Sequence, residues 1–270
     1  MTTNATVAAL FVYPLKSARG VARARVRITP TGFEWDRQWM VIDAHGKFLS
    51  QRTHPQLARI VSEVTDDTLV LTAPGLPRFA LPLADSGERV AVRVHLDPCV
   101  GVDQGSAAHE WVSGAVGESV RLVRVPPDPE RRANPVYAGA VPAPMGFADG
   151  YPVLVCNEAS LDDLNARMPE SVPMDRFRPN IVLRGLAAWA EDDIETLRIA
   201  DLTLRLVKPC TRCTIPSIDQ QTGLLSTDPA PVLRRFRFDK KLRGIAFGEN
   251  AVIEGGAGRE IERGAHCEVA

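Results

Sequence analysis

The sequence predicts a mixed, β-rich fold of the α+β class. Leucines at every second position from Leu202 to Leu206 give the alternation of a half-buried strand. Between residues 57 and 94, short runs rich in β-branched residues are separated by Asp, Gly and Pro clusters, at the spacing of a meander or small barrel. Helical patterns are few and short, at 106–116 and 161–168.

In the first half of the chain, strand patterns alternate with turn signals. Residues 7–12 are apolar but far shorter than the roughly 20 residues of a membrane span, so they predict a buried strand that Pro14 ends. Residues 36–43 and 47–50 predict a hairpin around His45-Gly46. We expect His109, in the helix at 106–116, to be a polar helical residue rather than a ligand. Other strands are expected at 26–28, 58–64, 68–71 and 89–94.

Six prolines between Pro126 and Pro144 indicate a long surface loop or an inter-domain crossing. We therefore predict a smaller, barrel-like N-terminal domain at 1–125, a crossing loop at 126–144 and a second domain at 145–270. The first 37 or so residues are expected to contribute to a cleft of the second domain. Asn157 or Ser160 can cap the helix at 161–168. Further strands are expected at 151–156, 181–183, 251–253 and 264–269.

The composition is that of an ordinary globular protein of one or two domains. The chain has 270 residues, 45% hydrophobic and 24% charged, with a net charge of -1. Because nothing in this balance attracts polyanions, we expect neither nucleic acid nor a membrane as a partner. Five cysteines without a disulfide-framework spacing indicate free thiols in a reducing compartment, and cytoplasmic location is the expectation.

Cys210 and Cys213 flank Arg212 just after Pro209, which is expected to end the preceding strand. Three chemical interpretations are open: a zinc site completed by His266 and Cys267, a redox dithiol, or a single thiolate ligand. Two small buried residues in a sheet are the plain alternative. Residues 214–217 are expected to be extended, and residues three apart in extended chain face opposite ways, so both sulfurs would not reach one ligand. Arg212 would favour a thiolate at Cys213.

Four motifs occur in order along the chain: Val12-Tyr13-Pro14-Leu15-Lys16-Ser17, Asp36-Arg37-Gln38-Trp39, Phe177-Arg178-Pro179-Asn180 and Pro209-Cys210-Thr211-Arg212-Cys213-Thr214. They resemble those of the MOSC family, in particular the group with an N-terminal MOSC-type β-barrel that includes amidoxime-reducing proteins. The resemblance spans nearly the whole chain and implies a MOSC β-barrel with a second, smaller barrel-like domain and a few helices.

Four cations lie at predicted strand ends or in loops beside them, and if gathered they would form an anion site suited to phosphate. These are Lys16, Arg37, Arg178 and Arg212. The resemblance implies molybdenum cofactor (Mo-molybdopterin), with Cys213 as catalytic ligand to the metal. It also implies phosphate and pterin contacts from Lys16, Ser17, Arg37, Arg178, Thr211 and Arg212, and polar contacts from Asn180 and Asn250. Asp149 is a candidate proton relay or a turn former, and Gly150 and Tyr151 depart from the small hydroxyl residues of some relatives.

The implied reaction is two-electron reduction of N-hydroxylated compounds such as amidoximes, hydroxylamines or N-hydroxylated bases. The chain carries no flavin, haem or iron–sulfur signature, so a ferredoxin- or flavoprotein-type donor is the expected electron source. One alternative is a persulfide carrier that uses Cys213 in cofactor maturation. Another is a pyridoxal phosphate protein with Lys16 as the Schiff-base lysine.

Overall fold

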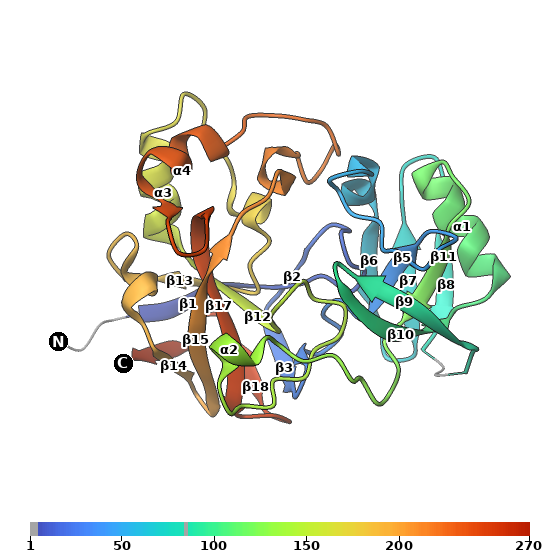
Figure 1. Ribbon diagram of the computed structural model, residues 1–270, viewed down its shortest axis with the longest axis horizontal. Coiled ribbons are helices and arrows are strands. Elements are labelled where there is room, and N and C mark those ends of the chain that lie inside the picture. Colours follow the sequence, from blue (N-terminus) through green and yellow to red (C-terminus); the bar gives the residue numbers. More distant parts are fainter. Residues whose placement is uncertain (1–4, 84–85) are drawn as a thin grey trace.

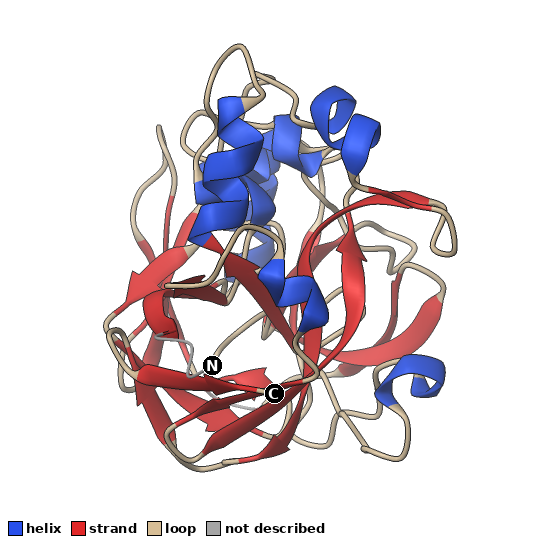
Figure 2. Ribbon diagram, turned by 90° about the vertical axis from the view of Figure 1, so that its left-hand side faces the viewer, coloured by secondary structure: helices blue, strands red, loops and turns tan. Residues whose placement is uncertain are grey.

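The computed structural model of the chain describes residues 5–83 and 86–270 and forms two lobes (Figure 1). The larger lobe is a β-barrel with most of the helices gathered at one end, and the smaller lobe contains two further sheets and one long helix (Figures 1 and 2). The predicted β-rich α+β class is therefore confirmed.

The larger lobe is built on a closed seven-stranded barrel, because its first and last strands, β12 and β17, also pair with each other. Leucine, isoleucine and valine side chains fill its interior, and the leucines at 202, 204 and 206 contribute to this core as the alternation predicts. The strands in spatial order are β12 (Val153–Asn157), β13 (Ile181–Arg184), β1 (Ala5–Val12), β19 (His266–Val269), β14 (Thr196–Ile199), β15 (Leu202–Thr211) and β17 (Gly244–Gly255).

The first strand of the chain, β1, is one of the seven barrel strands, although the other six come from the second half of the chain. Leu10 is opposite Ile181 in β13, and Ala5 is opposite Cys267 in β19. Four short strands also join this lobe, where β2 pairs with β1, and β3 lies between β4 and β18. The two lobes therefore do not correspond to the first and second halves of the chain. These strands are β2 (Val21–Arg23), β3 (Arg25–Thr29), β4 (Gly32–Phe33) and β18 (Glu260–Glu262).

The smaller lobe contains a four-stranded and a three-stranded sheet, which pack with α1 (Ser106–Val116). The helix has the predicted bounds and buries Trp111 and Val112. The predicted hairpin forms around residues 43–47, where Asp43 N donates to Lys47 O over 2.9 Å. The sheets are β5 (Trp39–Ile42), β11 (Arg121–Arg124), β10 (Asp97–Asp103) and β9 (Arg89–Val94), then β6 (Val61–Val64), β7 (Thr68–Thr72) and β8 (Phe79–Pro82).

The remaining helices are short. Asn157 caps the predicted helix of the second half, since its side chain accepts from Ala159 N over 3.2 Å. This helix and α4 pack over the barrel around Phe177 and Phe247. The remaining helices are α2 (Pro135–Ala138), α3 (Glu158–Ala166) and α4 (Ala230–Phe236), and the 3₁₀ turns are η1 (Pro55–Arg59), η2 (Met174–Phe177), η3 (Ala190–Asp193) and η4 (Ile215–Ser217). The short strand β16 (Phe238–Asp239) pairs with β17. Among the described residues, none of these helices has the length and apolarity to cross a membrane.

Three local predictions are wrong. The strand does not end at Pro209, because β15 continues to Thr211 with register shifts that accommodate the proline beside β17. Residues 215–217 form the 3₁₀ turn η4 instead of extended chain. Residues 58 and 59 belong to η1, and the strand begins only at Val61.

Glu249 is a buried carboxyl group in β17, only 3% exposed, and no described residue bonds to its Oε1. The neighbouring Gly248 has φ 75°, and a Cβ there would lie 2.6 Å from Cys156 Sγ, so only glycine allows this close packing. Burial first, and then the charges of Asp192 and Glu191, raise the pKa of Glu249 from 4.5 to about 9. At neutral pH the carboxyl is therefore protonated.

This protonation makes stability depend on pH. The pKa of Glu249 is higher in the folded state than in the unfolded state. Its protonation therefore contributes fully to the free energy of unfolding below pH 4.5, and this contribution falls by about 1.4 kcal/mol per pH unit as pH rises towards 9. We expect Glu249→Gln to remove this slope and to be more stable than wild type at pH 8. Urea unfolding between pH 5 and 9 measures it, with the exposed Glu268→Gln as control. Parallel pH profiles for Glu249→Gln and wild type would contradict the prediction.

Candidate functional site

A cavity of about 320 Å³ lies where the loops of the barrel meet the segment leading into the smaller lobe. All ten site residues predicted from the sequence line it, although they come from six separate stretches of the chain. They are Lys16, Ser17, Arg37, Asp149, Arg178, Asn180, Thr211, Arg212, Cys213 and Asn250. The four motif cations, Lys16, Arg37, Arg178 and Arg212, therefore converge on one cavity.

The backbone is unusual at three of these positions. Ser17, Arg37 and Arg178 have φ values of 68°, 48° and 57°, in the left-handed region that non-glycine residues seldom occupy. Such conformations persist where surrounding contacts fix them, and they are frequent at functional sites. Here Arg37 N donates to Tyr13 O over 2.8 Å, and Arg178 N donates to Asp175 O over 3.1 Å. The strained backbone turns all three side chains to one cavity.

Tyr13 holds two arginines beside each other. The guanidinium carbons of Arg37 and Arg178 lie 4.2 and 4.3 Å from its ring centroid, within the range of cation–π attraction. The Tyr13 hydroxyl donates to Pro179 O over 3.0 Å. Burial raises the pKa of Tyr13, so the ring carries no charge, and burial lowers the pKa of Arg178 to about 10, so the guanidinium remains protonated at neutral pH.

The cavity has an excess of positive charge. Five cations line it, and two of them have carboxylate partners, because Arg37 pairs with Asp36 and Lys16 with Asp149. The other three are Lys208, Arg178 and Arg212, and no carboxylate of the described chain forms an ion pair with them. The Nε of Arg212 is also buried without a partner among the described residues. An excess of three formal charges fits a multiply charged anion such as a phosphate ester.

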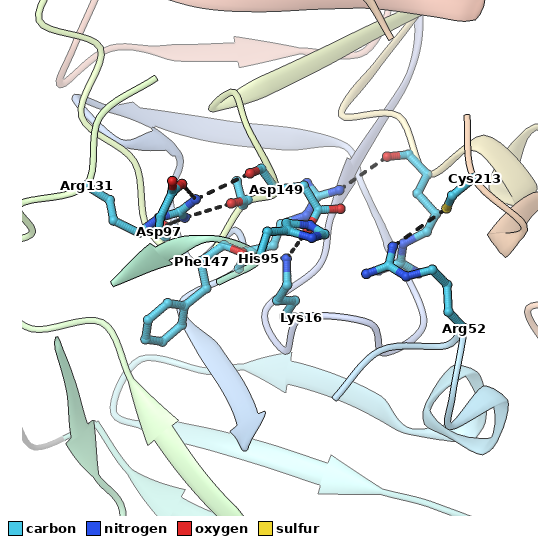
Figure 3. Close-up of polar contacts among 12 residues, drawn as sticks. Lys16, Arg52, His95, Asp97, Arg131, Phe147, Asp149 and Cys213 are labelled. Atoms are coloured by element: carbon cyan, nitrogen blue, oxygen red, sulfur yellow. Dashed lines mark hydrogen bonds and ion pairs between the residues drawn. The ribbon is translucent and has the colours of Figure 1, made fainter. Parts of the chain in front are cut away.

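Both cysteines of the loop line the cavity, which contradicts the prediction that they face opposite ways. Cys210 belongs to β15, which ends at Thr211, whereas Cys213 lies beyond the strand. The alternation of side chains along an extended chain therefore does not apply to this pair. Arg212 Nη1 donates to Cys210 Sγ over 2.9 Å. The charged group in contact with the exposed Cys213 is instead Arg52, with Nη1 3.7 Å from Sγ (Figure 3).

The proposed zinc ligand Cys267 lies elsewhere. Its side chain is fully buried in the barrel core, and it is not among the residues that line the cavity with Cys210 and Cys213. Within residues 5–83 and 86–270, no group of three or more Cys, His, Asp or Glu side chains could hold a metal ion. All five cysteines are free thiols, as expected. The structure therefore gives the zinc interpretation no ligand set.

Asp149 connects the cavity to the smaller lobe (Figure 3). Its Oδ1 accepts from Lys16 Nζ and lies 3.0 Å from His95 Nε2. Arg131 fixes the loop around it by donating to Ala148 O over 2.8 Å and to Asp149 O over 3.3 Å. Desolvation alone would raise the pKa of Asp149, but the charge of Lys16 and the contact with His95 outweigh it and hold the pKa well below its usual range. The carboxylate is ionised at neutral pH.

Two predicted polar contacts are already engaged within the protein. Asn180 Oδ1 accepts from Arg37 Nη1 over 3.0 Å and from Leu154 N over 3.2 Å, so Asn180 orients the arginine from the cavity wall. Asn250 Nδ2 donates to Lys208 O over 3.2 Å. By contrast, no residue of the described chain bonds to the Ser17 hydroxyl, which remains available to a ligand.

Sequence reasoning missed four cationic or titratable residues in or beside the site. They are Arg52, His95, Arg131 and Lys208. Lys208 lies in β15 and His95 directly after β9, whereas Arg52 and Arg131 lie in loops, so only the tertiary structure distinguishes these four from solvent-facing charges. His95 lies in the two-residue turn between β9 and β10, and the second of these strands was not predicted from the sequence.

Two family matches cover most of the chain. The MOSC N-terminal beta barrel domain matches residues 4–119, and the MOSC domain matches residues 142–268. The chain belongs to the MOSC family. The resemblance noted from the four motifs is therefore confirmed, and the MOSC domain contributes the cysteine loop, Asp149 and Arg178 to the cavity.

The MOSC chain is similar to curated mitochondrial amidoxime-reducing components. Component 1 of Mus musculus is 34% identical over 254 residues, covering 90% of this chain and 75% of the relative. Component 1 of Homo sapiens is 33% identical over 92% of this chain and 79% of the relative, and component 2 of Bos taurus is 33% identical over 86% and 72%. These relatives support a MOSC-domain oxidoreductase or sulfur-carrier family.

The contact between Arg52 and Cys213 predicts the reactivity of the thiol. Since a nearby positive charge stabilises a thiolate, which is the reactive form, we expect Arg52→Gln to slow alkylation of Cys213 by iodoacetamide roughly two- to fivefold, as for an exposed charge contact. Peptide mass spectrometry over a time course measures the rate. Arg59→Gln, an exposed arginine of the neighbouring η1, is the matched control, and equal rates in both variants would contradict a role for Arg52.

Proposed function

We propose that the chain is a molybdenum-cofactor-dependent reductase of N-hydroxylated compounds, with electrons from a separate ferredoxin- or flavoprotein-type donor. The observation that carries this proposal is the single cavity in which an exposed thiol, Cys213, lies among five cations with an excess of three positive charges. The relatives named amidoxime-reducing components support the reaction class. The five free thiols support a reducing, cytoplasmic setting.

The residues fit such a cofactor. Cys213 would supply a soft sulfur ligand to the metal. Arg178 and Arg212, which have no carboxylate partners in the described chain, would hold the phosphate, together with Arg37, the Ser17 hydroxyl and the Thr211 backbone. Asn180 orients Arg37, and Asn250 is a polar wall residue beside Lys208. When bound, the cofactor supplies two-electron oxygen-atom chemistry at molybdenum.

The residues of the chain then provide binding, orientation and protons. In the net reaction the N–O bond breaks, two electrons and two protons are consumed, and the oxygen leaves as water. Lys16 and Asp149 line the cavity and form an ion pair with each other. The other titratable groups of the cavity wall are the two thiols, the three arginines, Lys208 and Tyr151. We therefore assign proton supply to this ion pair and anion binding to the arginines.

The sulfur-carrier alternative shares the exposed Cys213 thiol and differs in the use of the cations. A persulfide carrier needs no resident anion, so the unpaired Arg178 and Arg212 favour the reductase. For pyridoxal phosphate, Lys16 is the required amine, but its Nζ donates to Phe147 O over 2.8 Å and pairs with Asp149. An amine held in this way is poorly placed to form a Schiff base.

We predict that Cys213→Ser loses molybdenum when expressed in a host that makes molybdenum cofactor, whereas Cys210→Ser retains it. Both cysteines line the same cavity, so the pair is matched in position and differs only in which sulfur is exposed. Metal analysis of purified wild type and both variants measures this. Reduction of benzamidoxime by wild type with a chemical electron donor is the accompanying assay.

Two outcomes would contradict the reductase. Wild type without stoichiometric molybdenum, but with persulfide at Cys213 by mass spectrometry, would favour the sulfur carrier. Equal molybdenum in wild type and Cys213→Ser would remove the thiolate as the ligand.

A further inference from the structure

His95 lies in the turn between β9 and β10 of the smaller lobe. Since Val94 pairs with Asp97, only His95 and Leu96 form the hairpin loop, and His95 has φ 55°, as tight hairpin turns require. This turn extends towards the barrel, so the imidazole reaches Asp149 (Figure 3). The Phe48 ring lies edge-on to it, with centroids 4.9 Å apart. The side chain is 42% exposed and therefore meets solvent.

Three titratable groups from three separate segments share one oxygen atom. Asp149 Oδ1 is in contact with Lys16 Nζ, which lines the cavity, and with His95 Nε2, which does not (Figure 3). Lys16 is only 5% exposed. The same Phe48 ring also lies 4.9 Å from Lys16 Nζ, so one aromatic side chain packs against both ends of the row. Lys16 is thus the buried end of the row, whereas Asp149 (59% exposed) and His95 (42% exposed) both meet solvent.

The surrounding charges hold this row in place. Arg131 is 5% exposed, donates to Asp149 O and pairs with Asp97 Oδ2 at 3.0 Å, two residues after His95. It therefore fixes both the loop of Asp149 and the hairpin of His95. Burial lowers the pKa of the Lys16 ammonium, which makes it a better acid than an exposed lysine, whereas Asp149 remains ionised at rest. An imidazole has two ring nitrogens, so it can accept a proton at one and donate a proton from the other.

We propose that His95 is the solvent-side end of a proton relay that runs through Asp149 Oδ1 to Lys16 in the cavity. The inference rests on the proposed function, because reduction of each N-hydroxylated substrate consumes two protons. An N–H bond of the Lys16 ammonium breaks and its proton passes to the leaving oxygen. His95 Nε2 then passes its proton to the ionised Asp149 Oδ1, which hands it on to the Lys16 amine, while Nδ1 of the imidazole takes up a proton from the solvent, so that both ring and carboxylate return to their resting charge. The electrons come from the external donor.

The first test needs no cofactor. In protein labelled with ¹⁵N-lysine, NMR measures exchange of the Lys16 ammonium hydrogens with water. We expect His95→Ala to slow this exchange roughly tenfold or more, because acid–base relays give effects of at least this size, and added imidazole to restore it. His95→Gln, which keeps a polar side chain of similar reach, should be slow as well. His54→Ala, which removes a histidine paired with Glu118 instead, is the control.

Unchanged or faster exchange in His95→Ala would overturn the relay, since His95 would then only shield Lys16.

The second arm is turnover of the loaded enzyme, where we expect kcat of His95→Ala to fall roughly tenfold with KM unchanged, and imidazole to rescue it. A loss of kcat that imidazole does not rescue would also overturn the relay. If wild type lacks molybdenum or does not reduce benzamidoxime, the proposed function fails, and the exchange measurement decides the relay alone.

Discussion

The site depends on one arrangement, the contact of the Tyr13 ring with the guanidinium groups of both Arg37 and Arg178. Two buried like charges repel each other, and each loses hydration on burial. The electron-rich faces of one aromatic ring offset part of this cost, and Asp36 neutralises Arg37. Arg178 is left without a carboxylate partner in the described chain. A buried guanidinium in that condition favours an anion at the same place, so the anion site follows from the packing of Tyr13.

The arrangement exists only because β1 belongs to the barrel. Tyr13 follows β1 directly, and β1 pairs with β13, which Arg178 and Asn180 precede. A second contact joins the lobes, where Gln51 and Gln220 exchange two hydrogen bonds of 2.9 Å and Gln51 also donates to Ser17 O. Both amides are almost fully buried, and leaving one unpaired would cost roughly 1–3 kcal/mol. This pair keeps the cysteine loop and Ser17 in fixed positions relative to each other.

The sequence predicts the composition of the site better than its geometry. The strand-end motifs bring Lys16, Arg37, Arg178 and Arg212 to one end of the barrel. Loops at the same end of a barrel lie close together in any strand order, so the sequence alone can suggest which residues meet there. What local patterns cannot predict is the pairing of segments far apart, such as Leu10 with Ile181. The same limit explains the error at Pro209. Its missing N–H stops an isolated strand pattern, but β17 accommodates it with a shift in register. Arg52 and His95 reach the site only through such pairings.

The two carboxylates divide the cations of the cavity into two kinds. Lys16 and Arg37 are neutralised by Asp149 and Asp36, so they contribute hydrogen bonds and, for Lys16, an acidic proton, but little net charge. Arg178, Arg212 and Lys208 keep their charge and create the field that an anion meets. If Lys16 were unpaired, the same field would draw the anion onto it and remove its proton from use. The ion pair with Asp149 therefore separates proton supply from anion binding within one cavity, and it does so with a residue that also faces the solvent-exposed imidazole of His95.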